Sequence, residues 1–236
     1  MKQSFSKGAL AALIAWVAMG LMLVSARAEE SIGLAIVYDT SGSMGLSVPD
    51  SVGKGTPKYV IANRAFLAIV DRLEAFHKEH PAVVLRTSLT VFDKLDARTV
   101  VPFGDFQPEQ LRTWIRGFSK PEGATPLGEA LRTAGEPLLK SGLSRRHVLV
   151  VTDGESNGKL TPPNAIAGLR AALVPRDATL GFHFVAFDVA AAAFQPVKNL
   201  GATVLSASNE KQLGTQLAVI LEKQILLEDE EPAKRK

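Results

Sequence analysis

Short apolar runs alternate with amphipathic segments along most of the chain. Runs with the length and residue types of buried strands occupy 33–38, 83–92, 147–152, 180–187 and 203–205. Apolar residues at helical spacing predict helices over 58–80, 108–117, 126–140, 163–173 and 210–227. The run 99–103 follows a polar turn after a strand, which predicts an antiparallel edge strand.

This alternation predicts an α/β fold. We expect a doubly wound, mostly parallel sheet of about six strands, one of them an antiparallel edge strand, with helices on both faces. The length fits one domain, expected over residues 29–228. In such a sheet, ligands bind beyond the carboxyl ends of the strands, where the strand order reverses.

The N-terminus has the pattern of a secretory signal peptide. Lys2 and Lys7 precede an uncharged apolar run from Ala9 to Val24, and Ala26-Arg27-Ala28 has the small-x-small form of a cleavage site. We therefore expect residues 1–28 to be removed, and the protein to be exported to a bacterial periplasm or secreted. The apolar run is shorter than the ~20 residues of a spanning helix, but an uncleaved membrane anchor is the alternative. After cleavage, no membrane span is expected.

Removing this leader changes the charge balance. The chain has 27 Lys and Arg against 24 Asp and Glu, and three of the basic residues lie in the leader, so the rest is formally neutral. No nucleic-acid partner is therefore expected. Because the chain has no cysteine, disulfides and lipid attachment at a lipobox are excluded. Residues 229–236 form a charged tail that we expect to be disordered.

Three polar fragments carry candidate chemistry. Asp39-Thr40-Ser41-Gly42-Ser43 directly follows the first strand, Gly123-Ala124-Thr125-Pro126 opens a helix, and Thr152-Asp153-Gly154 ends the strand 147–152. If both strands are central neighbours, Asp39 and Asp153 emerge side by side, with Pro126 as the first helical residue nearby. Alone, each fragment is a common turn or cap, but together they place carboxylates and hydroxyls at one edge. Hard divalent cations prefer such oxygen donors.

These fragments resemble the metal-ion-dependent adhesion site of the von Willebrand factor A family, and the resemblance extends from about Ile32 to Leu227. It implies that Ser41 and Ser43 bind a metal directly, and that Thr125 is a direct or switchable ligand. It also implies that Asp39 and Asp153 bind directly or through water. Mg2+ is the expected cofactor, with Mn2+ or Ca2+ as alternatives. The metal of such a site keeps an open position, which an Asp or Glu of a partner protein completes.

The sequence therefore predicts an exported, metal-dependent adhesion or docking module and not an enzyme. Its partner is another protein, and the chain is a monomer or part of a hetero-complex. One alternative is a Mg2+-dependent phosphatase or hydrolase with Asp39 as nucleophile, although Ser41 stands where such an enzyme would want a second acid. Another is a docking subunit of a membrane-associated complex. We also expect Asp39 and Ser41 to lie on a surface loop, so that Asp39→Ala and Ser41→Ala abolish partner binding but leave the fold intact.

Three other features are weaker. Residues 44–57, rich in Gly, Ser and Pro, are predicted to form an irregular loop. Asp188 ends a strand near the proposed site and is either a supporting residue or an ordinary turn. His77 and His80 have a spacing that could hold zinc, but no third ligand is evident, so solvated positions are favoured.

Overall fold

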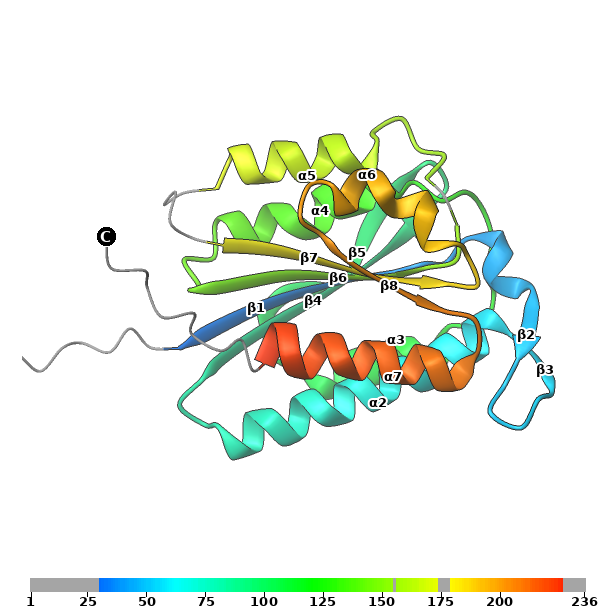
Figure 1. The fold of residues 1–236 in the computed structure, drawn as a ribbon. Coiled ribbons are helices and arrows are strands. Elements are labelled where there is room, and N and C mark those ends of the chain that lie inside the picture. Colours follow the sequence, from blue (N-terminus) through cyan, green and yellow to red (C-terminus); the bar gives the residue numbers. More distant parts are fainter. Residues whose placement is uncertain (1–29, 155, 174–178, 227–236) are drawn as a thin grey trace, which may run out of the picture.

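Six strands form one sheet between two layers of helices in the computed structural model, which describes residues 30–154, 156–173 and 179–226 (Figure 1). The strands of the sheet are β1 (Ser31–Tyr38), β4 (Val84–Asp93), β5 (Asp96–Asp105), β6 (Arg145–Thr152), β7 (Thr179–Phe187) and β8 (Thr203–Ala207). The helices are α2 (Lys58–Glu79), α3 (Pro108–Gly117), α4 (Leu127–Leu139), α5 (Pro162–Ala171), α6 (Gln195–Lys198) and α7 (Glu210–Ile220). The predicted signal peptide 1–28 and tail 229–236 lie outside the described residues.

The sheet has the strand order β5-β4-β1-β6-β7-β8. Only the β4–β5 pair is antiparallel, and the other four pairs are parallel. Every residue of β1 is buried, as its unbroken apolar sequence requires of a strand covered on both faces. The predicted α/β architecture with one antiparallel edge strand is therefore confirmed.

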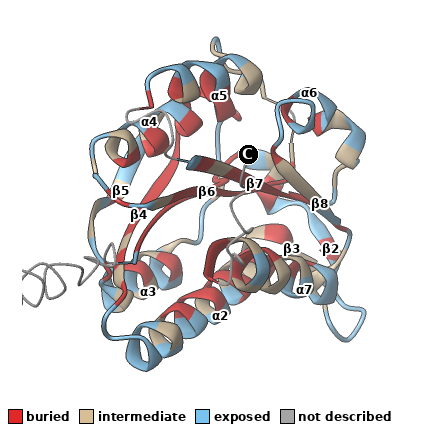
Figure 2. Ribbon diagram, turned by 60° about the vertical axis from the view of Figure 1, so that its left-hand side comes forward, coloured by how far each residue is buried: buried red, intermediate tan, exposed pale blue. Residues whose placement is uncertain are grey.

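Each face of the sheet carries its own apolar core. Helices α2, α3 and α7 cover one face, and α4, α5 and α6 cover the other (Figure 1). Figure 2 shows the buried central strands between helices whose outer sides are exposed. The chain leaves β1 through α2 on the first face and leaves β6 through α5 on the second. The order thus reverses between β1 and β6, which places a crevice at their carboxyl ends.

The segment 44–57 is more regular than its composition predicts. After a 3₁₀ turn at Gly42–Gly45, strands β2 (Ser47–Pro49) and β3 (Gly55–Pro57) form an antiparallel hairpin. The carboxylate of Asp50 accepts hydrogen bonds from the backbone N–H groups of Val52 and Lys54, which closes the turn. Strands of three residues are too short to leave a periodic signal, so the loop prediction was wrong here.

Two helical segments also differ from the predicted elements. A short 3₁₀ turn, Ala191–Phe194, leads into α6 in a stretch for which no helix was predicted. The last predicted helix ends as an α-helix at Ile220 and continues as a π-helical turn over Leu221–Leu226. Within the described ranges, no helix is both long enough and apolar enough to cross a membrane.

Candidate metal centre

Asp39 lies at the crevice between β1 and β6. Its backbone N–H donates to the carbonyl oxygen of Val151 at 3.2 Å, which extends the parallel pairing by one residue. One carboxylate oxygen, Oδ1, accepts from the Ser41 N–H at 2.8 Å, and Oδ2 accepts from the Thr152 hydroxyl at 2.6 Å. Asp39 is 0% exposed and Ser41 is 2% exposed. The expectation that both lie on a surface loop is therefore wrong, because the loop folds inward over the end of the sheet.

Burial also changes the acidity of Asp39. Loss of solvent raises the pKa of this carboxyl to about 6, the hydrogen bonds from Ser41 and Thr152 oppose the rise, and the negative charge of Asp153 adds to it. A buried carboxylate beside a second one gains stability from any cation that binds between them. The electrostatics of the crevice thus favour a positive ligand.

Ser41, Ser43 and Asp153 bring their oxygens together beside Asp39. The Oγ atoms of Ser41 and Ser43 are 3.0 Å apart, and the Ser43 hydroxyl donates to Asp153 Oδ1 at 2.7 Å. Neighbouring oxygens of an octahedron with ligand distances of ~2.1 Å are ~3 Å apart, so this spacing suits a small divalent cation such as Mg2+. The donor set therefore fits the metal that the sequence predicts.

Thr125 is held next to this cluster by the loop that precedes α4. Its N–H donates to Asn157 Oδ1 at 2.7 Å, and its carbonyl accepts from the Asn157 N–H at 3.0 Å. The buried Thr125 Oγ1 lies 3.5 Å from where a Cβ on Gly154 would stand, so it packs beside the residue that follows Asp153. The helix begins at Leu127, and Pro126 is its N-cap instead of its first residue as predicted. This shift by one residue leaves Thr125 in the loop.

Two charged groups lie beside the centre: Lys58, which was not predicted, and Asp188, for which both a supporting role and an ordinary turn were left open. Lys58 is the first residue of α2. Its ammonium donates a hydrogen bond to Asp153 Oδ2 at 2.9 Å and forms an ion pair with Asp188 Oδ2 at 2.9 Å. Burial alone would lower the pKa of Lys58, but Asp153 and Asp188 raise it above its usual value. Asp188 has a left-handed backbone with φ of 55°, which aspartate tolerates better than most residues. Nothing in the local sequence marks Lys58, because a lysine at the start of a surface helix is ordinary.

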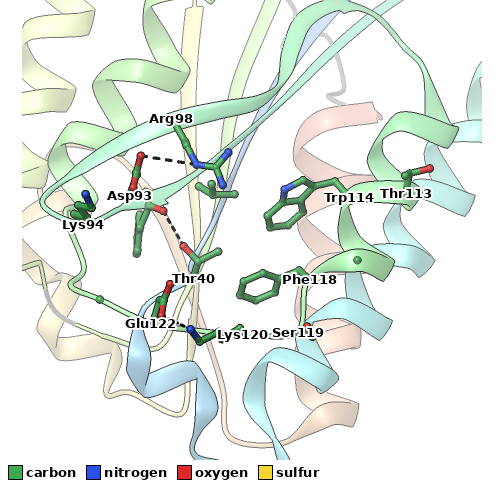
Figure 3. A pocket seen from close by; sticks show the side chains of 14 residues that line it. Thr40, Asp93, Lys94, Arg98, Thr113, Trp114, Phe118, Ser119, Lys120 and Glu122 are labelled. Atoms are coloured by element: carbon green, nitrogen blue, oxygen red, sulfur yellow. Dashed lines mark hydrogen bonds and ion pairs between the residues drawn. The ribbon is translucent and has the colours of Figure 1, made fainter.

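A groove adjoins the centre on the β4 side (Figure 3). This cavity of about 790 Å3 lies between the β4–β5 turn and the end of α3, and Thr40 forms part of its wall. Trp114 and Phe118 stack at 5.3 Å between ring centroids on one side, and Arg98 and Lys94 lie on the other. Arg98 pairs with Asp93 at 3.9 Å, so the groove has an aromatic wall facing a charged one.

Hydroxyl groups make up much of the oxygen donor set at this centre. Across the described ranges, no group of three or more His, Cys, Asp or Glu residues is placed to hold a metal ion. His80 stacks on Phe76 at 4.4 Å, and His77 contacts the edge of Phe106, so the predicted solvated positions of these histidines include aromatic contacts. A cation at the Asp39 centre would therefore depend on neutral serine and threonine oxygens, which leave it electrophilic.

Comparison with known proteins gives one sequence match and many structural ones. A family model described as von Willebrand factor type A domain matches residues 34–155. Among curated protein sequences, none matches the chain. Several solved structures share the fold at low sequence identity, and likeness at that level supports the fold alone.

Three of these structures illustrate the range. The PilB minor pilin from Streptococcus sanguinis has a TM-score of 0.59 at 14% identity, over 82% of this chain and 61% of that one. The vWF domain of the type V pili tip protein Mfa5 from Porphyromonas gingivalis has a TM-score of 0.61 at 12% identity, over 82% and 94%. Proximal thread matrix protein 1 from the mussel byssus, solved with a zinc-occupied MIDAS motif, has a TM-score of 0.58 at 16% identity, over 82% and 48%.

This chain spans only part of several of these relatives, from 46% to 62% of the pilin and thread-matrix chains. What those larger proteins do as wholes therefore does not transfer directly. The matched family model covers residues 34–155, slightly more than half of the chain, and this part contains Asp39, Thr125 and Asp153. The chain belongs to the von Willebrand factor type A domain family.

Proposed function

We propose that this protein is an exported docking module that binds a partner protein through a divalent cation. In this proposal Asp39, Ser41, Ser43, Thr125 and Asp153 hold the metal, and Mg2+ suits the hydroxyl-rich donor set best. The observation that carries it is the convergence of the Ser41, Ser43 and Asp153 oxygens, 2.7–3.0 Å apart, at the crevice between β1 and β6. The leader-like N-terminus supports export, and the pilus-tip and pilin relatives are consistent with adhesion.

The mechanism is binding and needs no nucleophile. The metal, when bound, supplies an electrophilic centre with an open coordination position. Asp39 contributes negative charge from a buried position, while the serine hydroxyls orient their lone pairs without neutralising the ion. A carboxylate of the partner would complete the coordination of such an ion, so that metal and partner would bind cooperatively.

The same geometry disfavours the hydrolase alternative. A nucleophilic Asp39 would need a free oxygen that can reach a phosphorus or carbonyl atom. Both of its carboxylate oxygens instead accept short hydrogen bonds from Ser41 and Thr152, and the side chain is fully buried. The position two residues later carries a hydroxyl and not a second acid.

Calorimetric titration of the protein without its leader tests this proposal. Mg2+ and Mn2+ should bind the wild type with one-to-one stoichiometry, and Ser43→Ala should weaken binding at least tenfold. A protein from an extract of its own source should then be retained in Mg2+, released by EDTA, and not retained by Ser43→Ala. The distant Ser141→Ala variant is the matched control. No metal binding by the wild type, or equal retention in Mg2+ and EDTA, would contradict the proposal.

A further inference from the structure

The candidate centre already contains a buried cation. The side chain of Lys58 is 5% exposed, and its ammonium is 2.9 Å from both Asp153 Oδ2 and Asp188 Oδ2. Asp153 divides its carboxylate between two partners, because Oδ1 accepts from the Ser43 hydroxyl and Oδ2 from Lys58. The lysine thus neutralises the same carboxylate that faces the serine hydroxyls.

The place of Lys58 in its helix makes this arrangement informative. A lysine at the N-terminus of α2 opposes the helix dipole, which favours negative charge there. Removing its ammonium from water adds a further cost. A positive charge at this position stabilises neither the helix nor the core. The ion pairs with Asp153 and Asp188 therefore offset the cost of burying the ammonium.

We propose that Lys58 is a resident cation that stabilises the metal-free form of the centre and weakens its affinity for a divalent ion. This inference rests on the proposed function. The three carboxylates Asp39, Asp153 and Asp188 and the one ammonium carry a formal charge of −2, which a divalent ion balances. Without the ammonium, Asp153 would be a buried carboxylate whose main source of positive charge is the metal. The ammonium would also repel a divalent cation held by Asp153, because both carry positive charge.

This role has a functional consequence. A site with its own cation keeps Asp153 in position before metal arrives, so the domain folds without metal. The bound metal remains exchangeable, and docking then responds to the concentration of the ion outside the cell. Lys58 therefore regulates the metal site without being a ligand to it.

Three variants separate this role from a merely structural one. Lys58→Met removes the resident charge, Asp188→Asn removes one of its acceptors and keeps a residue that tolerates the left-handed backbone, and Arg64→Met is the matched control. Arg64 lies on the same helix and pairs with Glu210, away from the centre. Each variant is titrated with Mn2+ and Mg2+ by calorimetry, and melted in EDTA and in saturating metal.

Lys58→Met should lower the melting temperature in EDTA, bind Mn2+ about tenfold more tightly, and show a larger rise in melting temperature with metal than the wild type. Asp188→Asn should bind several-fold more weakly, because the centre loses negative charge. Arg64→Met should bind like the wild type.

Weaker or unchanged metal binding by Lys58→Met would overturn the inference, as would an equal fall in melting temperature with and without metal. If Lys58→Met folds only in metal, the inference is supported in its strongest form. If Lys58→Met folds in neither condition, the metal affinity of Asp188→Asn decides. Weaker binding by Asp188→Asn supports the inference, and unchanged binding contradicts it. The proposed function is tested separately. If the wild type binds metal and Ser43→Ala does not, the proposed function holds even when the Lys58 variants refute its regulation.

Discussion

At the scale of single residues, both oxygens of the Asp39 carboxylate are engaged before any ligand binds. Oδ1 accepts from Ser41 and Oδ2 from Thr152, in a site from which water is excluded. Asp39→Ala should therefore lower the unfolding free energy in EDTA by about 1–3 kcal/mol, because two buried donors lose their acceptor. Asp39→Asn should cost less, since its amide oxygen still accepts from Ser41. Urea titration in EDTA measures both.

The same residue explains what sequence could and could not predict about the site. The order of the three fragments and their position after apolar strands were enough to bring Asp39, Ser41, Ser43 and Asp153 together. Burial could not be predicted, because a run of Asp, Thr, Ser and Gly is typical of an exposed turn. Lys58 and Asn157 were missed for a similar reason. Each is an ordinary surface residue in sequence, and only long-range contacts give it a role.

At the scale of elements, strands β6 and β7 bury a pair of histidines. His147 Nδ1 lies 3.1 Å from His183 Nε2 on the face of the sheet that α7 covers. Burial, then the neighbouring His183 and Arg145 charges, lower the pKa of His147 to about 3, and burial lowers the pKa of His183 to about 4. Both rings are therefore neutral in the folded protein at any pH above these values.

This pair predicts acid sensitivity. Unfolded histidines titrate near pH 6.5, so between pH 6.5 and 4 the unfolded chain binds more protons and stability falls as the pH falls. The loss should be about 2 kcal/mol per histidine at pH 5. The double variant His147→Gln/His183→Gln should show a flatter fall than the wild type in urea titrations at several pH values. The exposed His80→Gln is the control, and a wild-type slope equal to that of the double variant would refute the assignment.

Close packing of α4 supports the loop that carries Asn157. A Cβ on Gly128 would lie 2.0 Å from the Leu160 carbonyl oxygen, so an alanine there must displace backbone. Gly128→Ala should destabilise the protein by at least ~2 kcal/mol. Gly214 lies exposed in α7 with nothing within 4 Å of its position for a Cβ, so Gly214→Ala should stabilise by up to ~1 kcal/mol. Thermal melts of the two variants should shift in opposite directions.

The lengths of the strands also determined which of them could be predicted from the sequence. Apolar runs predicted the six strands of the sheet, although β8 was predicted from the short run 203–205, and the antiparallel edge was recognised by its polar turn. The β2–β3 hairpin was not predicted, because Val48 is the one buried residue of its two short strands, and the carboxylate of Asp50 closes its turn. That hairpin leads directly into Lys58, so the least predictable element also borders the candidate centre.

At the scale of the whole molecule, exposed apolar side chains gather at one edge of the sheet. Val52 at the tip of the β2–β3 hairpin is 85% exposed, and Leu95 in the β4–β5 turn is 63% exposed. Both lie on loops at the edge where the parallel strands end, on either side of the crevice that holds Asp39. These two exposed apolar side chains could make contacts beside a ligand bound at the polar centre.

A partner that docks through the metal should therefore contact these loops as well. Val52→Ser and Leu95→Ser should each weaken metal-dependent retention of that partner about fivefold or more, while leaving the Mn2+ affinity unchanged, because neither side chain approaches the metal ligands. Leu200→Ser is the control, since Leu200 lies just before β8, at the opposite edge. Surface plasmon resonance with the captured partner, in Mg2+ and in EDTA, gives the affinities. If Leu200→Ser weakens binding as much as Val52→Ser, the partner does not dock on this face, even if its binding requires the metal.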